Sequence, residues 1–323
     1  DAKDRAGGRT AINMDIRAGI NNANFALRNS GVNGRIRLVG TVETALANAS
    51  STDTVNSKDA QLEFMGKILQ DGGFFSARSK FNQLRDNLGG DIVGFVGGYL
   101  KGAPGWGKVL TDPNDADNRR ENTIFTVRWT SLRGFTLPHE IGHNLGAKHD
   151  RAEADGEGAY SYSYGFVNPL SDYDNLSAAD SMRWWRTIMA YSTVCKGCPP
   201  VWRYSNPDSS INGDPMGVAS GSNSADNVRT FNNTMPLIQT VESAPHIVAG
   251  TITNSITGQP ANDVLVSTSN GYFDVTESDG YYEIPVKDGE SVTLTYSKSS
   301  GDYVFNPPSF TFTGVDGDRS KNV

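Results

Sequence analysis

Residues Thr136 to Asp150 read Thr-Leu-Pro-His-Glu-Ile-Gly-His-Asn-Leu-Gly-Ala-Lys-His-Asp. His139 and His143 are four residues apart, so a helix places both imidazoles on one face, one turn above the other. Two imidazoles on one face can reach a single cation. Glu140 lies beside them, where it can act on a water bound to that cation. The spacing therefore predicts a helix that carries two ligands of a metal site.

The second part of this stretch supplies a third ligand. Gly146 allows the helix to end in a sharp turn, because glycine accepts the left-handed conformation at helix ends. The turn brings His149 back towards the first two histidines. The sequence has four histidines, and three of them stand at these positions, which argues against ordinary core or surface histidines. Three histidines and a water form the open tetrahedral site typical of catalytic Zn²⁺. A decayed site without catalysis is the alternative.

The pattern H-E-x-x-H-x-x-G-x-x-H resembles the zinc motif of the metzincin metalloendopeptidases. That clan also has a Met-turn, and Trp185-Arg-Thr-Ile-Met-Ala-Tyr-Ser192 resembles it, with Met189 as a packed floor under the metal. Asp150 matches the adamalysin, or reprolysin, pattern, in which the carboxylate ties the histidine segment to the Met-turn. Tyr191 departs from adamalysins and resembles astacins and serralysins, in which this tyrosine binds zinc or moves to the reaction intermediate.

Two further segments, Cys195-Lys-Gly-Cys198 and Tyr204-Ser-Asn-Pro207, make the chain most similar to the bacterial peptidyl-Asp metalloendopeptidases over about residues 139–233. The resemblance implies hydrolysis of internal peptide bonds in protein or peptide substrates, with cleavage on the N-terminal side of Asp or Glu. It also implies a secreted enzyme whose precursor carries an inhibitory pro-segment. We therefore expect the chain that starts at Asp1 to be a mature form.

In the implied reaction, zinc is held by His139, His143 and His149 and lowers the pKa of its water towards ~7. Glu140 takes the proton as general base and passes it to the leaving amine. Tyr191 is a candidate to stabilise the oxyanion through its phenolic hydroxyl. The alternative for Tyr191 is a packed tyrosine or a fifth zinc ligand with little kinetic role.

An acidic substrate side chain needs a paired cation, because desolvating an unpaired carboxylate is too costly. The segment after the Met-turn offers Lys196 and Arg203, and Arg229 can approach from the terminal helix. Arg203 is the first choice, since a guanidinium binds a carboxylate bidentately. The alternative for each of the three is a solvated surface charge.

Cys195 and Cys198 are the only cysteines. A CxxC pair can be redox-active, metal-binding or a small disulfide. Two thiolates cannot complete a structural zinc site, and no thioredoxin-like pattern surrounds them. We expect a disulfide that closes a small loop in an oxidising exterior.

The composition suits a soluble globular protein of two domains, because the chain has 323 residues of which 37% are hydrophobic and 20% charged. The net charge of −7 argues against a nucleic-acid partner. No apolar stretch approaches the ~20 residues that span a bilayer. We expect a monomer without a membrane span.

Residues 1–243 predict a metzincin catalytic domain of the α/β (α+β) class, with a twisted mixed sheet and the zinc-binding helix. Thr10 is the expected N-cap of the first helix and Asn29-Ser30-Gly31 its end. Residues 91–97 are expected at the centre of the sheet. The resemblance to metzincins implies that a short strand within 106–110 forms the sheet edge on which substrate lies extended. Helices are predicted at 11–29, 58–70, 77–87 and 224–242, strands at 34–44, 91–97, 106–110 and 124–129, and loops at 101–122, 151–184 and 193–222.

Two local features stay open. Residues 112–122 hold several oxygen ligands, so a Ca²⁺ site is one reading and an ordinary solvated loop the other, since the EF-hand spacing is absent. Pro236 can interrupt the terminal helix.

Residues 247–323 predict a separate small all-β sandwich, with Ala244-Pro245 as the boundary. Gly250-x-Ile-x-Asn-x-x-Thr-Gly258, Asp279-Gly-Tyr-Tyr282 and Tyr303-x-Phe-x-Pro307 resemble the carboxypeptidase-regulatory-like, or transthyretin-like, modules of secreted proteins. The sequence identifies no ligand for this module. Strands are predicted at 247–253, 264–268, 271–276, 281–286, 291–296 and 309–313.

Two other functions remain as alternatives. One is a broad-specificity metzincin without acidic preference. The other is an adhesion or binding protein whose protease site is vestigial. The presence of Glu140 argues against the second, because a vestigial site has no chemical need for that base.

Overall fold

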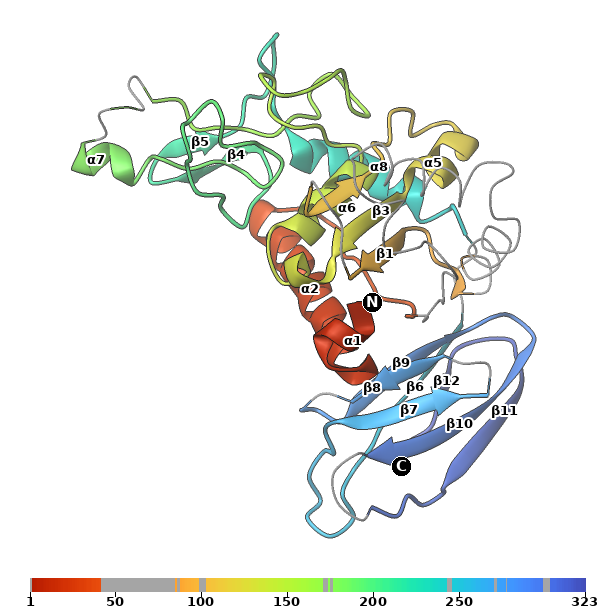
Figure 1. The fold of residues 1–323 in the computed structure, drawn as a ribbon. Helices are drawn as coiled ribbons and strands as arrows, with labels where there is room; N and C mark the ends of the chain where they lie inside the picture. The colour runs from red at the N-terminus through yellow and green to blue at the C-terminus, as the bar shows by residue number, and fades with distance from the viewer. Residues whose placement is uncertain are drawn as a thin grey trace, which may run out of the picture. The chain divides into compact units, whose positions relative to one another are not determined.

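A computed structural model shows two compact units in the chain (Figure 1). The first unit holds residues 1–37, 50–73 and 91–241, and the second holds residues 38–49, 74–90 and 242–323. The residues described are 2–41, 85, 88–98, 103–170, 174, 177–242, 246–269, 272–276, 278–298 and 303–323. The predicted helices at 58–70 and 77–87 lie outside them, apart from Arg85, which is helical.

The first unit combines helices with two small sheets. Its buried core is formed mainly by α2, β3, α6 and α8. Within the described residues, no helix is both long and apolar enough to cross a bilayer. The elements are α1 Ala2–Ala6, α2 Arg9–Ser30, β1 Val93–Gly97, β2 Gly105–Gly107, α5 Ala116–Asn122, β3 Ile124–Arg128, the 3₁₀ turn η1 Trp129–Ser131, α6 Thr136–Asn144, α7 Ala178–Ser181, β4 Asn206–Ile211, β5 Asp214–Met216 and α8 Asn227–Ile238.

The main sheet of this unit is mixed, with the strand order β1-β3-β2. β1 is parallel to β3, and β2 is antiparallel to it. Strands are therefore present at all three predicted positions. The prediction that 91–97 is central is wrong for the described strands, because β3 has a partner on each side. β3 is buried along its first four residues, whereas β1 is only partly buried, so the continuous apolar strand occupies the centre. β2 is an edge, as predicted.

The predicted helix at 11–29 is confirmed as α2, which packs on α6. A Cβ at Gly19 would lie 2.5 Å from the Leu137 side chain, so glycine allows the two helices to approach closely. The helix ends at Gly31, whose φ is 88°, as expected for a left-handed cap. The prediction of Thr10 as N-cap is wrong: the helix begins at Arg9, and Gly8 precedes it.

The predicted strand at 34–44 is wrong for its described part, residues 34–41, which form no strand. The backbone of Ile36 is paired with the side chain of Asn24 on α2. Its N–H donates to Asn24 Oδ1 and its carbonyl accepts from Asn24 Nδ2, both at 2.8 Å. A side-chain amide thus takes the place of a neighbouring strand. Residues 42–44 lie outside the described part of the chain.

Three segments read as loop or interrupted helix are more regular than predicted. Residues 116–122 form α5, with Asp115 accepting the cap hydrogen bond from Asn118 N–H. Residues 206–216 form a hairpin of β4 and β5. Pro236 lies inside α8 and does not interrupt it.

The second unit consists of two sheets that share one apolar core. One has the order β11-β10-β7-β8 and the other β12-β6-β9. All six predicted strands are present, and β12 was not predicted. Val39 and Leu88 pack with this core, although they precede the histidine stretch in the chain. The elements are β6 His246–Thr251, β7 Val264–Thr268, β8 Phe273–Val275, β9 Tyr281–Val286, β10 Glu290–Lys298, β11 Ser309–Val315 and β12 Arg319–Ser320.

Candidate metal centre

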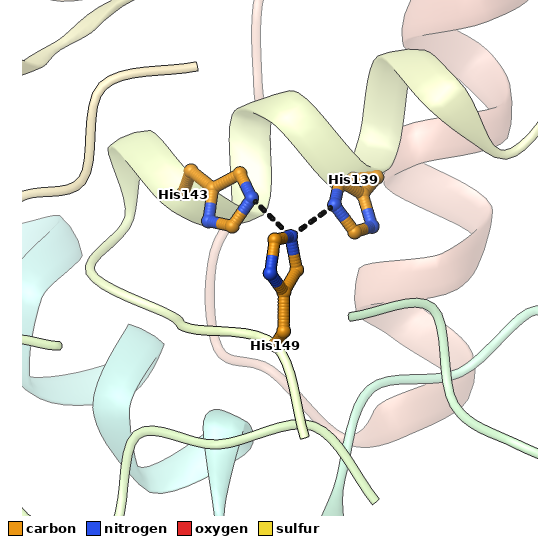
Figure 2. Close-up of side chains that lie close together, drawn as sticks. All are labelled: His139, His143 and His149. Carbon is orange, nitrogen blue, oxygen red and sulfur yellow. Dashed lines mark hydrogen bonds between the residues drawn. The ribbon is translucent and has the colours of Figure 1, made fainter. Parts of the chain in front are cut away.

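The helix α6 carries His139 and His143 on one face, and His149 approaches them from the segment that follows (Figure 2). The Nε2 atom of His149 lies 3.2 Å from Nε2 of His139 and 3.1 Å from Nε2 of His143. Within the described residues this is the one cluster of three or more His, Cys, Asp or Glu side chains able to hold a metal ion. The three ligand atoms lie within 4.8 Å of one another.

The Nδ1 atoms of His139 and His143 form hydrogen bonds that direct the Nε2 atoms towards His149. His139 Nδ1 lies 2.9 Å from the carbonyl oxygen of Ile188, and His143 Nδ1 lies 2.8 Å from that of Ala147. A carbonyl can only accept, so each Nδ1 carries the proton and each Nε2 presents a lone pair. Lone pairs that converge at this distance repel one another unless a cation lies between them. Neutral imidazoles with oriented second nitrogens are the donor set of zinc.

The protonation states agree with this reading. Burial, and then the nearby His149, lower the pKa of His139 to about 4. Burial likewise lowers the pKa of His143 well below its ordinary value, with His139 and His149 contributing. Both rings are therefore neutral near pH 7, which is the form that binds a metal.

Gly146 makes the return of the chain possible. Its φ is +97°, and its N–H donates to the carbonyl of His143 at 2.9 Å. A Cβ at this position would lie 2.6 Å from Cβ of Ala159. A side chain would therefore be excluded both by conformation and by space. The turn places His149 opposite the helix face that carries the other two histidines.

Glu140 is buried, with 5% of its surface exposed, and faces the edge strand β2. The backbone N–H of Gly107 donates a hydrogen bond to its carboxyl group. A Cβ on Gly105 would lie 2.7 Å from Glu140 Oε1, and one on Gly107 would lie 3.2 Å from Oε2. Burial raises the pKa of Glu140 to about 8, against the effect of the Gly107 hydrogen bond. A dication bound nearby would favour the carboxylate form.

The methionine and the aspartate lie where the resemblance puts them. Met189 is fully buried, and a Cβ on Gly142 of α6 would lie 2.4 Å from its sulfur, so the methionine packs directly under the helix. Asp150 Oδ2 accepts a hydrogen bond of 2.8 Å from the N–H of Tyr191, and Oδ1 accepts one of 3.3 Å from Ala152. This carboxylate links the histidine segment to the turn that contains Met189.

Tyr191 covers the histidine cluster on the side of the Met-turn. Its ring centroid lies 4.0 Å from that of His149 and 6.0 Å from that of His139. Its side chain is partly open, with 41% of the residue exposed. Burial raises the pKa of Tyr191, and Glu140 adds to the effect. The phenol therefore keeps its proton near neutral pH and can donate it in a hydrogen bond.

Tyr204, which is distant from the histidines in sequence, forms a hydrogen bond to α6. The Tyr204 hydroxyl donates to the carbonyl of Pro138 at 2.8 Å, and the Tyr204 N–H donates to Ser30 Oγ of α2 at 2.7 Å. Tyr204 is fully buried. These two bonds join α2, α6 and the segment after the Met-turn.

The predicted disulfide is present between Cys195 and Cys198. The three cations predicted for substrate binding point to other partners. Lys196 pairs with Asp174 in an exposed ion pair. Arg203 donates to Ser209 Oγ at 3.1 Å and contacts Met216 Sδ.

Arg229, the last of the three, stacks over the ring of Tyr162, with its guanidinium carbon 4.2 Å from the ring centroid. The sequence reading missed two other features: the glycines of β2 that contact Glu140, and Arg186 beside the Met-turn. Alternation of Gly105-Trp-Gly107 was a signal for the first. For Arg186 the only signal was a basic residue three positions before Met189.

A mixed sheet, a helix bearing two histidines, a returning third histidine and a methionine floor together define a zinc-metallopeptidase type of centre. The chain matches the family profile described as "Metallo-peptidase family M12", of reprolysin type, over residues 3–203. The chain belongs to this family.

Three relatives bear the name "Peptidyl-Asp metalloendopeptidase". Two come from Stenotrophomonas maltophilia strains, R551-3 and K279a, and are 41% and 38% identical to this chain over 113 residues, or 35% of it. The third, from Xanthomonas campestris pv. campestris, is 39% identical over 110 residues, or 34% of the chain. The matched segments span 24%, 24% and 22% of the respective relatives, which is about a quarter of their length.

One solved structure, "Structure of a chaperone-substrate complex", aligns with a TM-score of 0.48 and 18% identity, over 73% of this chain and 36% of that chain. This likeness is too weak to support an argument about fold or function.

Proposed function

We propose that the protein is a zinc-dependent endopeptidase that hydrolyses internal peptide bonds of protein substrates. The observation that carries the proposal is the convergence of three Nε2 atoms beside a buried glutamate that faces a sheet edge. The family membership supports the same chemistry. In this proposal His139, His143 and His149 hold the zinc ion.

Zinc, when bound, lowers the pKa of a water and polarises the scissile carbonyl. Glu140 then has the role of general base. Its carboxyl group lies against Gly105 and Gly107 of β2, and it takes a proton from the attacking water and delivers it to the leaving amine. Met189 and Gly146 have positioning roles, as a floor under α6 and as the turn that returns His149.

Tyr191 is proposed as the hydrogen-bond donor to the oxyanion. Its ring lies against His149 and its phenol keeps its proton at neutral pH, so the hydroxyl is available where negative charge develops. A merely packed role, or a fifth-ligand role, would leave the reaction little changed in Tyr191→Phe.

The proposed specificity is cleavage on the N-terminal side of Asp or Glu. It is supported by three relatives that carry the name "Peptidyl-Asp metalloendopeptidase" at 38–41% identity. Substrate is proposed to lie extended along β2, which is an edge strand among the strands that the structure describes, because edge strands can bind a peptide through their backbone.

The wider setting of the enzyme is also a proposal. Secretion is supported by the Cys195–Cys198 disulfide, since disulfides persist in oxidising compartments. We further propose that residues 1–243 form the catalytic domain and that the enzyme is a monomer made from a precursor with an inhibitory pro-segment. Residues 247–323 are proposed as a β-sandwich of the carboxypeptidase-regulatory-like type, supported by two sheets around one core.

The test measures zinc content and cleavage of casein and of short peptides by the wild type and by Glu140→Gln. We expect one zinc per chain in both proteins, the same melting temperature, and cleavage by the wild type alone. Glutamine keeps the size of the side chain but cannot take the proton. Removal of zinc with a chelator should abolish cleavage, and re-addition should restore it.

Two results would contradict the proposal. Cleavage by Glu140→Gln at the wild-type rate would remove the general-base role. A zinc-loaded wild type that binds peptides but cleaves none would favour a binding protein with a vestigial site.

A further inference from the structure

The basic side chains that could bind a substrate carboxylate differ in what they contact. Lys196 is paired with Asp174, and Arg229 is stacked on Tyr162. Arg203 is directed at Ser209 and Met216 of the β4–β5 hairpin. A fourth basic residue, Arg183, forms a two-pronged ion pair with Asp214 through Nε and Nη2. Each of these side chains contacts a partner of its own.

Arg186 is held differently. Its Nε donates to the carbonyl of Cys198 at 3.1 Å, and its Nη1 donates to the carbonyl of Ala190. Its backbone is also fixed, because its N–H donates to Pro199 and its carbonyl accepts from Val201. Two neutral acceptors therefore orient the guanidinium without neutralising it, and Nη2 takes part in neither bond.

The position of Arg186 relates it to the reacting centre. Ala190, which it binds, stands between buried Met189 and Tyr191, whose ring lies 4.0 Å from that of His149. The positive charge of Arg186 contributes to the lowered pKa of His139, and Tyr191 raises the pKa of Arg186. Glu140, which follows His139 on α6, contacts β2. A peptide bound over the histidines therefore lies near β2 and near the segment that contains Tyr191 and Ala190.

Electrostatics make this guanidinium receptive to an anion. The side chain is partly buried, and burial lowers the pKa of Arg186, although Asp150 acts in the opposite direction. Arginine nevertheless keeps its charge in proteins. The Asp150 carboxylate acts on this charge without a hydrogen bond to the guanidinium, because its oxygens accept from the N–H groups of Tyr191 and Ala152. A partly desolvated cation gains more from a carboxylate than a solvated one does.

We propose that Arg186 is the specificity-determining residue, which binds the carboxylate of the Asp or Glu that follows the scissile bond. This inference rests on the proposed function. The carbonyls of Ala190 and Cys198 hold the guanidinium in place, so little conformational freedom is lost when the substrate carboxylate binds. The disulfide Cys195–Cys198 has a positioning role, since it fixes the loop that supplies one of these carbonyls.

The test compares three peptides that differ only in Asp, Asn or Leu after the scissile bond. Each is assayed with the wild type, Arg186→Gln, Arg186→Lys, the rival Arg203→Gln and the matched control Arg183→Gln. We expect Arg186→Gln to lose at least about 30-fold in kcat/KM for the Asp peptide, as for a partner removed from a buried charge pair. Its kcat/KM for the Leu peptide should stay near that of the wild type.

Arg186→Lys should keep part of the preference for Asp over Asn, because the charge remains but the fork geometry is lost. A readout without turnover uses zinc-loaded Glu140→Gln, with and without Arg186→Gln, and measures peptide affinity by calorimetry. The Asp-over-Asn affinity ratio should collapse in the double variant. Zinc content and melting temperature identify any variant that fails to fold, in which case Arg186→Lys decides.

The outcomes separate the two proposals. A wild type that cleaves no peptide contradicts the proposed function itself. A wild type that cleaves the Asp and Leu peptides equally contradicts the acidic preference. An Asp preference that persists in Arg186→Gln and Arg186→Lys, or that disappears only in Arg203→Gln, overturns the assignment of Arg186. An equal loss for all three peptides in folded Arg186 variants shows a purely structural role and also overturns it.

Discussion

Asp150 holds two distant segments together through one buried carboxylate. It accepts the N–H of Tyr191 after the Met-turn and the N–H of Ala152 in its own segment. We expect Asp150→Ala to lower the free energy of unfolding by about 1–3 kcal/mol, because it removes the acceptor of a partly buried backbone N–H. Zinc affinity should fall as well, since His149 is the preceding residue. Chemical denaturation and a zinc-competition titration measure the two effects.

The matched control is Asp316→Ala. Asp316 and its partner Arg319 are both exposed, and exposed ion pairs contribute little. Its stability and zinc affinity should stay close to those of the wild type. Indistinguishable behaviour of Asp150→Ala and Asp316→Ala would show that the link between the segments contributes nothing.

For single residues, spacing along the sequence predicted which side chains share a helix face. It did not predict which distant partner a side chain contacts. The positions of His139 and His143 follow from helix periodicity, which acts within one turn. The direction of Arg203 depends on Ser209 and Met216, which belong to a hairpin that the sequence reading took for loop. A side chain whose partners lie on an unrecognised element cannot be oriented from its own neighbourhood.

There is little space between the edge strand β2 and Glu140 of α6. We expect Gly107→Ala to reduce kcat strongly while zinc stays bound, because the new Cβ would lie 2.7 Å from the Glu140 carbonyl and 3.2 Å from its Oε2. The strand or the carboxyl group must then shift, and small misplacements of a catalytic group are costly. Steady-state kinetics with zinc analysis check this.

Gly134→Ala provides the comparison, because its added Cβ would meet nothing nearer than the Ser131 carbonyl at 3.7 Å. Its kcat should match that of the wild type. An unchanged kcat in Gly107→Ala, with the fold intact, would mean that the contact between β2 and Glu140 has no catalytic weight.

Elements with strong periodicity or burial were predictable, and elements set by side chains from elsewhere were not. The helix α2 and the strand β3 follow from their own apolar patterns. The alternation in residues 34–41 also looked like a strand, yet Asn24 takes both backbone groups of Ile36. Tertiary context overrode the local pattern there.

The two compact units are not separated by a single boundary in the sequence, because each contains several segments of the chain. Residues 38–41, 85 and 88–90 belong with the C-terminal sheets in one compact unit, and Val39 and Leu88 pack against their core. Contacts between segments distant in sequence are invisible to composition, so the sequence reading placed one break near Ala244. Ala244 itself lies outside the described residues.

We nevertheless predict that the fragment 1–243 cleaves peptides with an unchanged kcat/KM. The contacts described for the three histidines and Glu140 come from residues between Gly105 and Tyr204. The fragment should bind hydrophobic dyes more strongly than the full chain, because Val39 and Leu88 lose their cover. Peptide assays and dye fluorescence on both proteins check this. A folded, zinc-loaded fragment without activity would place part of the catalytic machinery in the tail.

The hydrogen bonds of Tyr204 to Pro138 and Ser30 also depend on the order in which the chain is synthesised. The helix with the histidines emerges from the ribosome before its support does. At about 5–20 residues per second, translation needs several seconds to proceed from His149 to Tyr204. Until Met189 is synthesised, the nascent chain has its metal ligands without the methionine that packs under α6, and until Tyr204 it lacks the hydrogen bonds to Pro138 and Ser30. The proposed peptidase centre can therefore be complete only after Tyr204 has been synthesised.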